Sequence, residues 1–199
     1  MLGNLRRQSP RPSRVIRQLS HAAFLALLLS AGASALEIGD AVPSFSGTTV
    51  QGDSFSLAEA QRGHRAVVVI FRSTLCPYSN YYNDALHDLV GQYEPQKVLF
   101  VAVHSDRLET EDDIRTHARK HGHTFPVIRD PRGELARLLD ARRTPEVFVL
   151  DQGGKLRYHG RIASKLGTPD LRNALDALLA GQPINPAETK SFGCSIDRS

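Results

Sequence analysis

Three apolar runs stand out in the pattern of hydrophobic and polar positions, at residues 66–71, 98–103 and 146–150, the last of which begins with Glu146. They are rich in Val, Ile, Leu and Phe and have polar residues on both sides. A short, continuous apolar run is typical of a strand that is buried on both faces, as in parallel sheets. The pattern therefore predicts three strands inside one sheet. A turn at 151–154 then leads into a polar-alternating run at 155–158, which we expect to pair antiparallel with the third strand.

Helical spacing lies between the predicted strands. Pro77 opens a segment whose apolar residues, from Leu86 to Tyr93, repeat at i, i+3, i+4 and i+7, and Pro95 ends it. A polar helix is expected over 109–122, where Thr110 is a candidate N-cap followed by acidic residues. Shorter helical patterns cover 134–139 and 168–181. This order of strands and helices predicts an α/β fold with a central mixed sheet flanked by helices on both faces.

The remaining segments before the last helix are short and extended. Residues 37–63 are expected to contain turns, with Gln51-Gly52-Asp53 between two extended pieces as in a hairpin. Residues 125–128 predict another short extended piece. With these pieces, the mature chain is expected to form one domain over 36–182, and a tail over 183–199 follows it.

Residues 1–35 have the pattern of an export signal. Five arginines come first, an apolar run at 22–29 follows, and Ala33-Ser34-Ala35 fits a signal-peptidase site. We expect cleavage and a periplasmic or extracellular location, without a membrane span in the mature protein. The alternative is an uncleaved anchor, although the apolar run is shorter than the ~20 residues that cross a bilayer.

Charge gives no reason to expect nucleic-acid binding. The chain has 25 Lys and Arg residues, but the five arginines of the signal are not balanced by any acid within it. The rest of the chain carries 21 acidic residues against the remaining 20 basic ones. Such a near-neutral body lacks the basic surface that contacts phosphates.

Cys76 is the candidate nucleophile because it stands where a buried strand ends and a helix begins. The unpaired N–H groups and the positive dipole of a helix N-terminus stabilise a thiolate, which is the reactive form. Pro77 suits the first helical position, and the Ser79 hydroxyl could donate to the sulfur. The alternative is an inert cysteine buried for packing.

Cys194 is the second of only two cysteines and lies in the tail, which we expect to be mobile. In an exported protein it could form a disulfide with Cys76. A resolving thiol, a permanent structural bridge and an intermolecular bridge all remain open, since connectivity does not follow from sequence.

Four segments together resemble the redoxins, the branch of the thioredoxin-like superfamily that includes alkyl hydroperoxide reductase and thiol-specific antioxidant proteins. They are residues 38–45, 67–79, 124–130 and 143–147. The resemblance extends over most of the chain after residue 35 and implies a thioredoxin-like fold. It also implies that the Thr144-Pro145 bond is cis and faces Cys76.

The chain departs from its relatives at several positions. Ser79 stands where dithiol oxidoreductases have their second cysteine. In peroxiredoxins a Pro, a Thr or Ser, and an Arg accompany the reactive cysteine, and the corresponding positions here hold Val69, Ser73 and Pro145. Arg72 or Arg143 could replace the missing arginine.

These observations predict an exported thiol-dependent oxidoreductase that acts on a disulfide-bearing protein or a small peroxide, with an external thiol as reductant. Cys76 would attack, Cys194 would resolve, and Ser73 and Ser79 would support the sulfur. The expected substrate contacts are Pro77, Tyr78, Thr144 and Pro145.

The alternative functions are a non-catalytic binding module, favoured by the missing second cysteine, and a metal carrier. No cofactor or metal site is expected, because the histidines lack a recognised ligand spacing. His121 and His123 are interpreted as a solvated helix end, and the charged stretch 109–120 as an exposed helix face.

Overall fold

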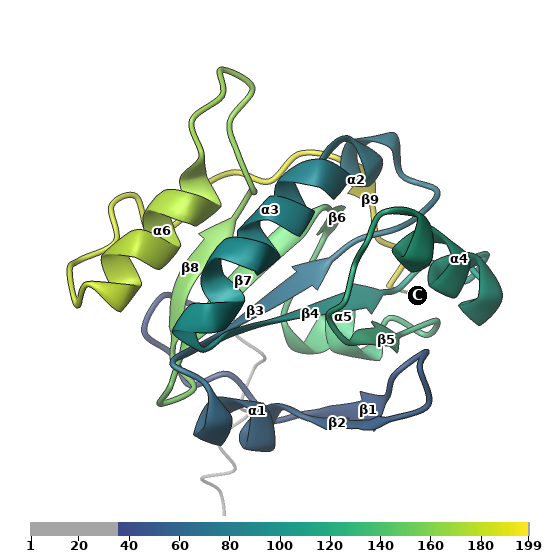
Figure 1. Cartoon of the computed structure of the whole chain (residues 1–199), viewed down its shortest axis with the longest axis horizontal. Coiled ribbons are helices and arrows are strands. Elements are labelled where there is room, and N and C mark those ends of the chain that lie inside the picture. Colours follow the sequence, from purple (N-terminus) through teal and green to yellow (C-terminus); the bar gives the residue numbers. More distant parts are fainter. Residues whose placement is uncertain (1–35, 199) are drawn as a thin grey trace, which may run out of the picture. The chain divides into compact units, whose positions relative to one another are not determined.

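A five-stranded mixed sheet forms the centre of the computed structural model, which describes residues 36–198 (Figure 1). The predicted signal at 1–35 lies outside the described residues. The strand order is β5-β4-β3-β7-β8, in which β3, β4 and β5 are parallel while β7 and β8 are antiparallel to their neighbours. The strands are β3 (Ala66–Phe71), β4 (Val98–His104), β5 (Val127–Arg129), β7 (Glu146–Asp151) and β8 (Leu156–Gly160).

The three apolar runs are the central strands, as predicted, because their side chains are buried on both faces. In β3, Val68 and Ile70 belong to one core and Val67, Val69 and Phe71 to the other. The first core is closed by α3 (Asn83–Tyr93), α4 (Glu111–Lys120) and α6 (Asp170–Leu179). The second is closed by α1 (Leu57–Gly63) and α5 (Glu134–Leu138). The predicted thioredoxin-like architecture with helices on both faces is thus confirmed.

Two local expectations were wrong. The helix after β3 is divided into α2 (Pro77–Tyr81) and α3, because the backbone of Tyr82, at φ −98° and ψ 11°, leaves the helical conformation. As predicted, α3 ends before Pro95, which lies inside the 3₁₀ turn η1 (Glu94–Gln96). The segment 37–63 contains, besides the predicted hairpin of β1 (Ser46–Thr48) and β2 (Ser54–Ser56), the helix α1, whose N-terminus Ser56 caps.

The C-terminal tail is an ordered part of the fold, contrary to the expectation of a mobile segment. Its strand β9 (Cys194–Ser195) pairs antiparallel with β6 (Arg143–Thr144). The Ile196 N–H continues the pairing by donating to the Arg142 carbonyl at 3.0 Å. The tail thereby closes over the carboxyl end of β3, next to α2 (Figure 1). Within residues 36–198, no helix has the length and apolar character that crossing a membrane requires.

Candidate active site

Cys76 is the N-cap of α2 and stands one short loop beyond the end of β3. Cys76 is 2% exposed, and its Sγ thiol donates to the Thr144 carbonyl oxygen at 3.1 Å. Thr144 precedes Pro145 across a cis peptide bond, as the resemblance implies. The fold therefore brings the end of β3 and the start of β7 together at one sulfur, at the carboxyl edge where such sheets gather their reactive groups.

Cys194 lies beside Cys76, and both are free thiols. The pairing register sets Cys194 opposite Thr144, the residue whose carbonyl receives the Cys76 thiol. Gly193 makes this close approach feasible: a Cβ atom there would lie 2.0 Å from the Thr144 oxygen. Only glycine fits such a contact, at a backbone φ of +153°. Sequence reasoning named both cysteines, and the structure brings them together.

The two thiols have opposite pKa shifts. Burial raises the pKa of Cys76, but hydrogen bonds from Cys194, the Thr144 side chain and the Ser79 backbone outweigh it and lower the pKa from 9.0 to about 7. Burial raises the pKa of Cys194, and its hydrogen bond to Cys76 and the negative charge there raise it further, to about 11. Near neutral pH the pair therefore holds its charge on Cys76 and its proton on Cys194, which favours Cys76 as the candidate nucleophile.

The hydroxyls of Ser73 and Ser79 form hydrogen bonds within the loop that carries Cys76. The Ser79 hydroxyl accepts from the Ser73 N–H at 3.3 Å, whereas the sulfur is stabilised by the Ser79 backbone N–H. The predicted bond from the Ser79 hydroxyl to the sulfur is therefore replaced by a main-chain contact. The Ser73 hydroxyl accepts from the Leu75 N–H at 3.1 Å, and the Ser73 carbonyl accepts from the Cys76 N–H at 3.3 Å. These bonds fix the turn that presents the cysteine.

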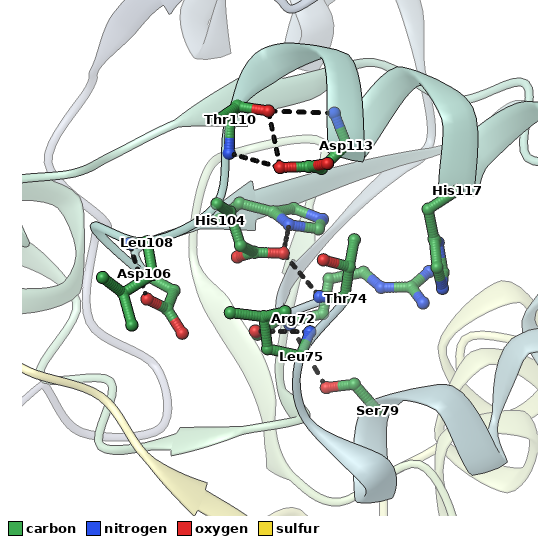
Figure 2. A network of polar contacts seen from close by, with 12 residues as sticks. Arg72, Thr74, Leu75, Ser79, His104, Asp106, Leu108, Thr110, Asp113 and His117 are labelled. Carbon is green, nitrogen blue, oxygen red and sulfur yellow. Dashed lines mark hydrogen bonds and ion pairs between the residues drawn. The ribbon is translucent and has the colours of Figure 1, made fainter.

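Glu109 is a functional candidate that sequence reasoning missed, because it was assigned to an exposed helix face. It is 1% exposed and precedes α4, whose cap is Thr110 in a capping box with Asp113. Its Oε1 accepts from the Thr74 N–H at 2.5 Å and lies 3.0 Å from His104 Nδ1. The two partners, Thr74 and His104, are labelled in Figure 2. The candidate N-cap at Thr110 is the signal that could have placed Glu109 just before the helix. A buried carboxylate thus anchors the loop that carries Cys76.

Arg72, one of the two candidates to replace the peroxidatic arginine, is buried behind the same loop and is bonded to other side chains. Its Nη2 donates to Asn83 Oδ1 at 2.5 Å and its Nη1 to His123 Nδ1 at 3.2 Å. Burial lowers the Arg72 pKa to about 10, although the charge of Glu109 opposes this. Arg143, the other candidate, bonds Ser195 Oγ at 2.8 Å on the exposed side of the tail.

The histidines near the end of α4 are only partly solvated, which corrects the expectation of a solvated helix end. His123 is held between Arg72 and the Asn83 carbonyl, and His117 Nε2 lies 2.9 Å from Asn80 Oδ1. Burial, followed by the charge of Arg72, lowers the pKa of His123 to about 4 and that of His117 to about 3. Within the described residues, no group of three or more His, Cys, Asp or Glu side chains is arranged to hold a metal ion.

One hollow is lined by the cysteine pair, and a second begins at the residue that follows Cys76. The first, of about 510 Å³, contains both sulfur-bearing residues and is also lined by Ser73, Leu75, Leu108, Thr144 and Ile196. The second, of about 800 Å³, starts at Pro77 and Tyr78 and is lined mainly by aromatic and small side chains. Of the predicted substrate contacts, Thr144 thus lies in the first hollow and Pro77 and Tyr78 in the second. Pro145 is not among the residues that line either one.

Residues 38–159 match the family model described as "AhpC/TSA family". A "Thioredoxin-like protein" of Haemophilus influenzae is 30% identical over 104 residues, which cover 52% of this chain and 59% of that relative. The match therefore spans less than two thirds of the relative's length.

Two solved structures have a similar fold. A hypothetical protein from Sinorhizobium meliloti 1021 gives a TM-score of 0.76 at 28% identity, over 83% of this chain and 97% of that one. A thiol:disulfide interchange protein from Chlorobium tepidum TLS gives a TM-score of 0.61 at 22% identity, over 73% and 99%. The second likeness concerns the fold alone.

Proposed function

The chain belongs to the AhpC/TSA family, and on that premise we propose that it is an exported thiol-dependent oxidoreductase with Cys76 as nucleophile and Cys194 as resolving thiol. The observation that carries the proposal is the pair itself. A thiol whose pKa is lowered to about 7 lies in hydrogen-bond contact with a second thiol whose pKa is raised to about 11. One cysteine is ready to attack and the other is held protonated beside it.

The favoured reaction is thiol–disulfide exchange. The Cys76 thiolate attacks one sulfur of a partner disulfide, the partner's S–S bond breaks, and its other sulfur leaves as a thiolate that takes up a proton. Cys194 then loses its proton and attacks Cys76, which releases the partner as a dithiol. The partner gains two electrons, and the protein is left with a Cys76–Cys194 disulfide that an external thiol reduces.

Peroxide reduction is the second candidate, and the family match favours it. The thiolate would take one peroxide oxygen as a sulfenic acid and release water, and Cys194 would condense with that acid to a disulfide and a second water. Peroxide reduction is disfavoured because the arginine that activates peroxide is missing. Pro145 occupies its sequence position, and Arg72 is bonded to Asn83 and His123 instead. We therefore place disulfide exchange first.

A non-catalytic binding role loses its main support once the second thiol is considered. The role rested on the absence of a cysteine at Ser79, whereas Cys194 supplies a neighbouring thiol from the tail. The proposal of export rests on the sequence pattern of residues 1–35.

Intact-mass kinetics on the fully reduced protein would test the proposal. We expect stoichiometric 2,2′-dipyridyl disulfide to remove two hydrogens within minutes, whereas Cys194→Ser would retain a thiopyridyl adduct on Cys76. The same experiment with hydrogen peroxide distinguishes the two reactions, since a peroxidase would lose two hydrogens equally fast. A protein that remains reduced with both oxidants, or a Cys76→Ser variant that reacts like the wild type, would refute the proposed function.

A further inference from the structure

Exposed apolar side chains are concentrated around the cysteine pair. The described residues include seven exposed large hydrophobic side chains: Ile38, Leu75, Tyr78, Tyr81, Leu108, Leu138 and Leu166. Leu75 and Leu108 line the first hollow, Tyr78 and Tyr81 the second, and Leu166 a third hollow next to it. Exposed apolar surface gathered in one region marks a contact site for another molecule. A small peroxide needs no such surface, whereas a polypeptide does.

The second and third hollows share lining residues and form one groove that starts at Pro77, the residue after Cys76. They have volumes of about 800 and 450 Å³ and share Ser164, Lys165 and Phe192 as lining residues. At one end, Pro77 directly follows Cys76 in the chain, and Tyr78 packs edge-on against Phe192 with ring centroids 6.1 Å apart. The other wall is the loop between β8 and α6, which extends beyond the helices in Figure 1. We call this the tyrosine groove.

The far end of the tyrosine groove is positive. Its third hollow is lined by Arg161, Lys165 and Lys190, and no acidic residue lines it. Arg161 is bonded to Asp170 at 2.7 Å, which balances its charge, so the two lysines determine the sign. The Lys165 ammonium lies 5.4 Å from the Phe192 ring centroid and is thereby held over the groove. The only acidic lining residue is Asp84, in the second hollow.

We propose that the tyrosine groove docks a partner polypeptide in which the disulfide cysteine is flanked by an apolar residue and then by acidic residues. The apolar side chain would cover Tyr78 and Tyr81, and the acidic side chains would lie against Lys165 and Lys190. Complementary charge at the end of a groove fixes the direction and register of its occupant more than its affinity. The inference rests on the proposed disulfide exchange and specifies the partner for that reaction. The attack is the one given above: a Cys76–peptide disulfide forms and the second sulfur of the probe leaves as a thiol.

The probe is the palindromic peptide Glu-Glu-Phe-Cys-Phe-Glu-Glu as a mixed disulfide with 2-mercaptopyridine, so that either chain direction can dock. The matched control of opposite charge is the same peptide with Lys in place of Glu, and 2,2′-dipyridyl disulfide serves as the uncharged small probe. Release of pyridine-2-thione by the full-length reduced protein gives the rate. We expect the acidic peptide to react about fivefold or more faster than the basic one, and the ratio to fall with added salt.

Charge reversal in the groove gives the decisive comparison. In Lys165→Glu the acidic-to-basic rate ratio should fall about fivefold, while Lys155→Glu, an exposed lysine in the β7–β8 turn, should keep the wild-type ratio. Tyr81→Ser should slow both peptides relative to dipyridyl disulfide. Equal rates for the two peptides, or a ratio that Lys155→Glu changes as much as Lys165→Glu, would overturn the inference while the proposed function stands. Failure of all three disulfides to react would overturn the proposed disulfide exchange itself.

Discussion

Gly193 is the residue through which the tail can be displaced without removing either thiol. In Gly193→Ala the new Cβ would lie 2.0 Å from the Thr144 oxygen and 2.8 Å from its carbon, and both atoms are backbone atoms that cannot rotate away. The β6–β9 pairing must therefore open, and Cys194 must move with it. We expect Cys76 to lose the hydrogen bonds from the Cys194 thiol and backbone, which include the largest of those that lower its pKa.

The size of the effect follows from the two limiting pKa values. With a pKa of about 7, Cys76 is about half thiolate at pH 7, whereas the ordinary value of 9.0 leaves about 1%. The contacts from the Thr144 side chain and the Ser79 backbone remain, so the pKa should rise only part of the way. We expect the midpoint of the pH–rate curve to move upward by about 0.5 to 1 unit, and the alkylation rate at pH 7 to fall about two- to fivefold.

Iodoacetamide alkylation between pH 5 and 10, with the site located by mass spectrometry, measures this midpoint. The matched control is Gly181→Ala, which introduces the same methyl group at a positive φ of +68° but meets open space at the end of α6. Near pH 10 the Gly193→Ala and wild-type rates should converge. A midpoint near pH 7 in Gly193→Ala, together with easier alkylation of Cys194, would show that the tail is displaced without affecting Cys76 and would refute the reasoning.

Three further predictions concern the surroundings of the sulfur. Glu109→Ala leaves the Thr74 N–H and the buried His104 without their hydrogen-bond partner and removes the negative charge that acts on Arg72, so urea unfolding should show a loss on the order of 3–5 kcal/mol, whereas exposed Glu111→Ala should change the stability by less than about 0.5 kcal/mol. Thr144→Val removes a hydroxyl that helps to lower the pKa of the nucleophilic thiol, so the alkylation midpoint should rise. His117 and His123 have folded-state pKa values of about 3 and 4, below the 6.5 of the unfolded chain. The unfolded state therefore binds more protons, and the free energy of unfolding should fall as the pH drops from about 6.5 to 4, less steeply in His123→Gln.

The sheet could be predicted from the sequence because its signal is local. The runs that became β3, β4 and β7 are apolar at every central position, and a segment of that kind has to be buried on both faces. The Thr110 cap and Cys76 at a helix start are local signals too, since each depends on residues within one turn. Patterns of this range carry most of the fold and the identity of the nucleophile.

The partners of the nucleophile could not be predicted, because they depend on contacts between distant segments. In the sequence, Glu109 looks like one more acid at the start of a charged helix. Only the packing of the segment after β4 against the cysteine loop buries its carboxylate, which accepts from the Thr74 N–H. In the same way, the tail sequence gives no register, and the position of Cys194 is set by its pairing with Thr144. The pKa of Cys76 depends on that pairing and so lies beyond any reading of its neighbours in the chain.

The two thiols also determine the order of their own reactions. After burial, the pKa of Cys194 is raised by its hydrogen bond to Cys76 and by the negative charge there, so Cys194 is protonated and inert as long as Cys76 is a thiolate. Once Cys76 has formed a mixed disulfide, its sulfur carries no charge, and both of those causes disappear. The pKa of Cys194 must then fall toward its ordinary value, and the resolving thiolate becomes available only after the first step. In the proposed reaction, a partner disulfide is therefore attacked by Cys76 alone, and Cys194 is activated by the product of that attack.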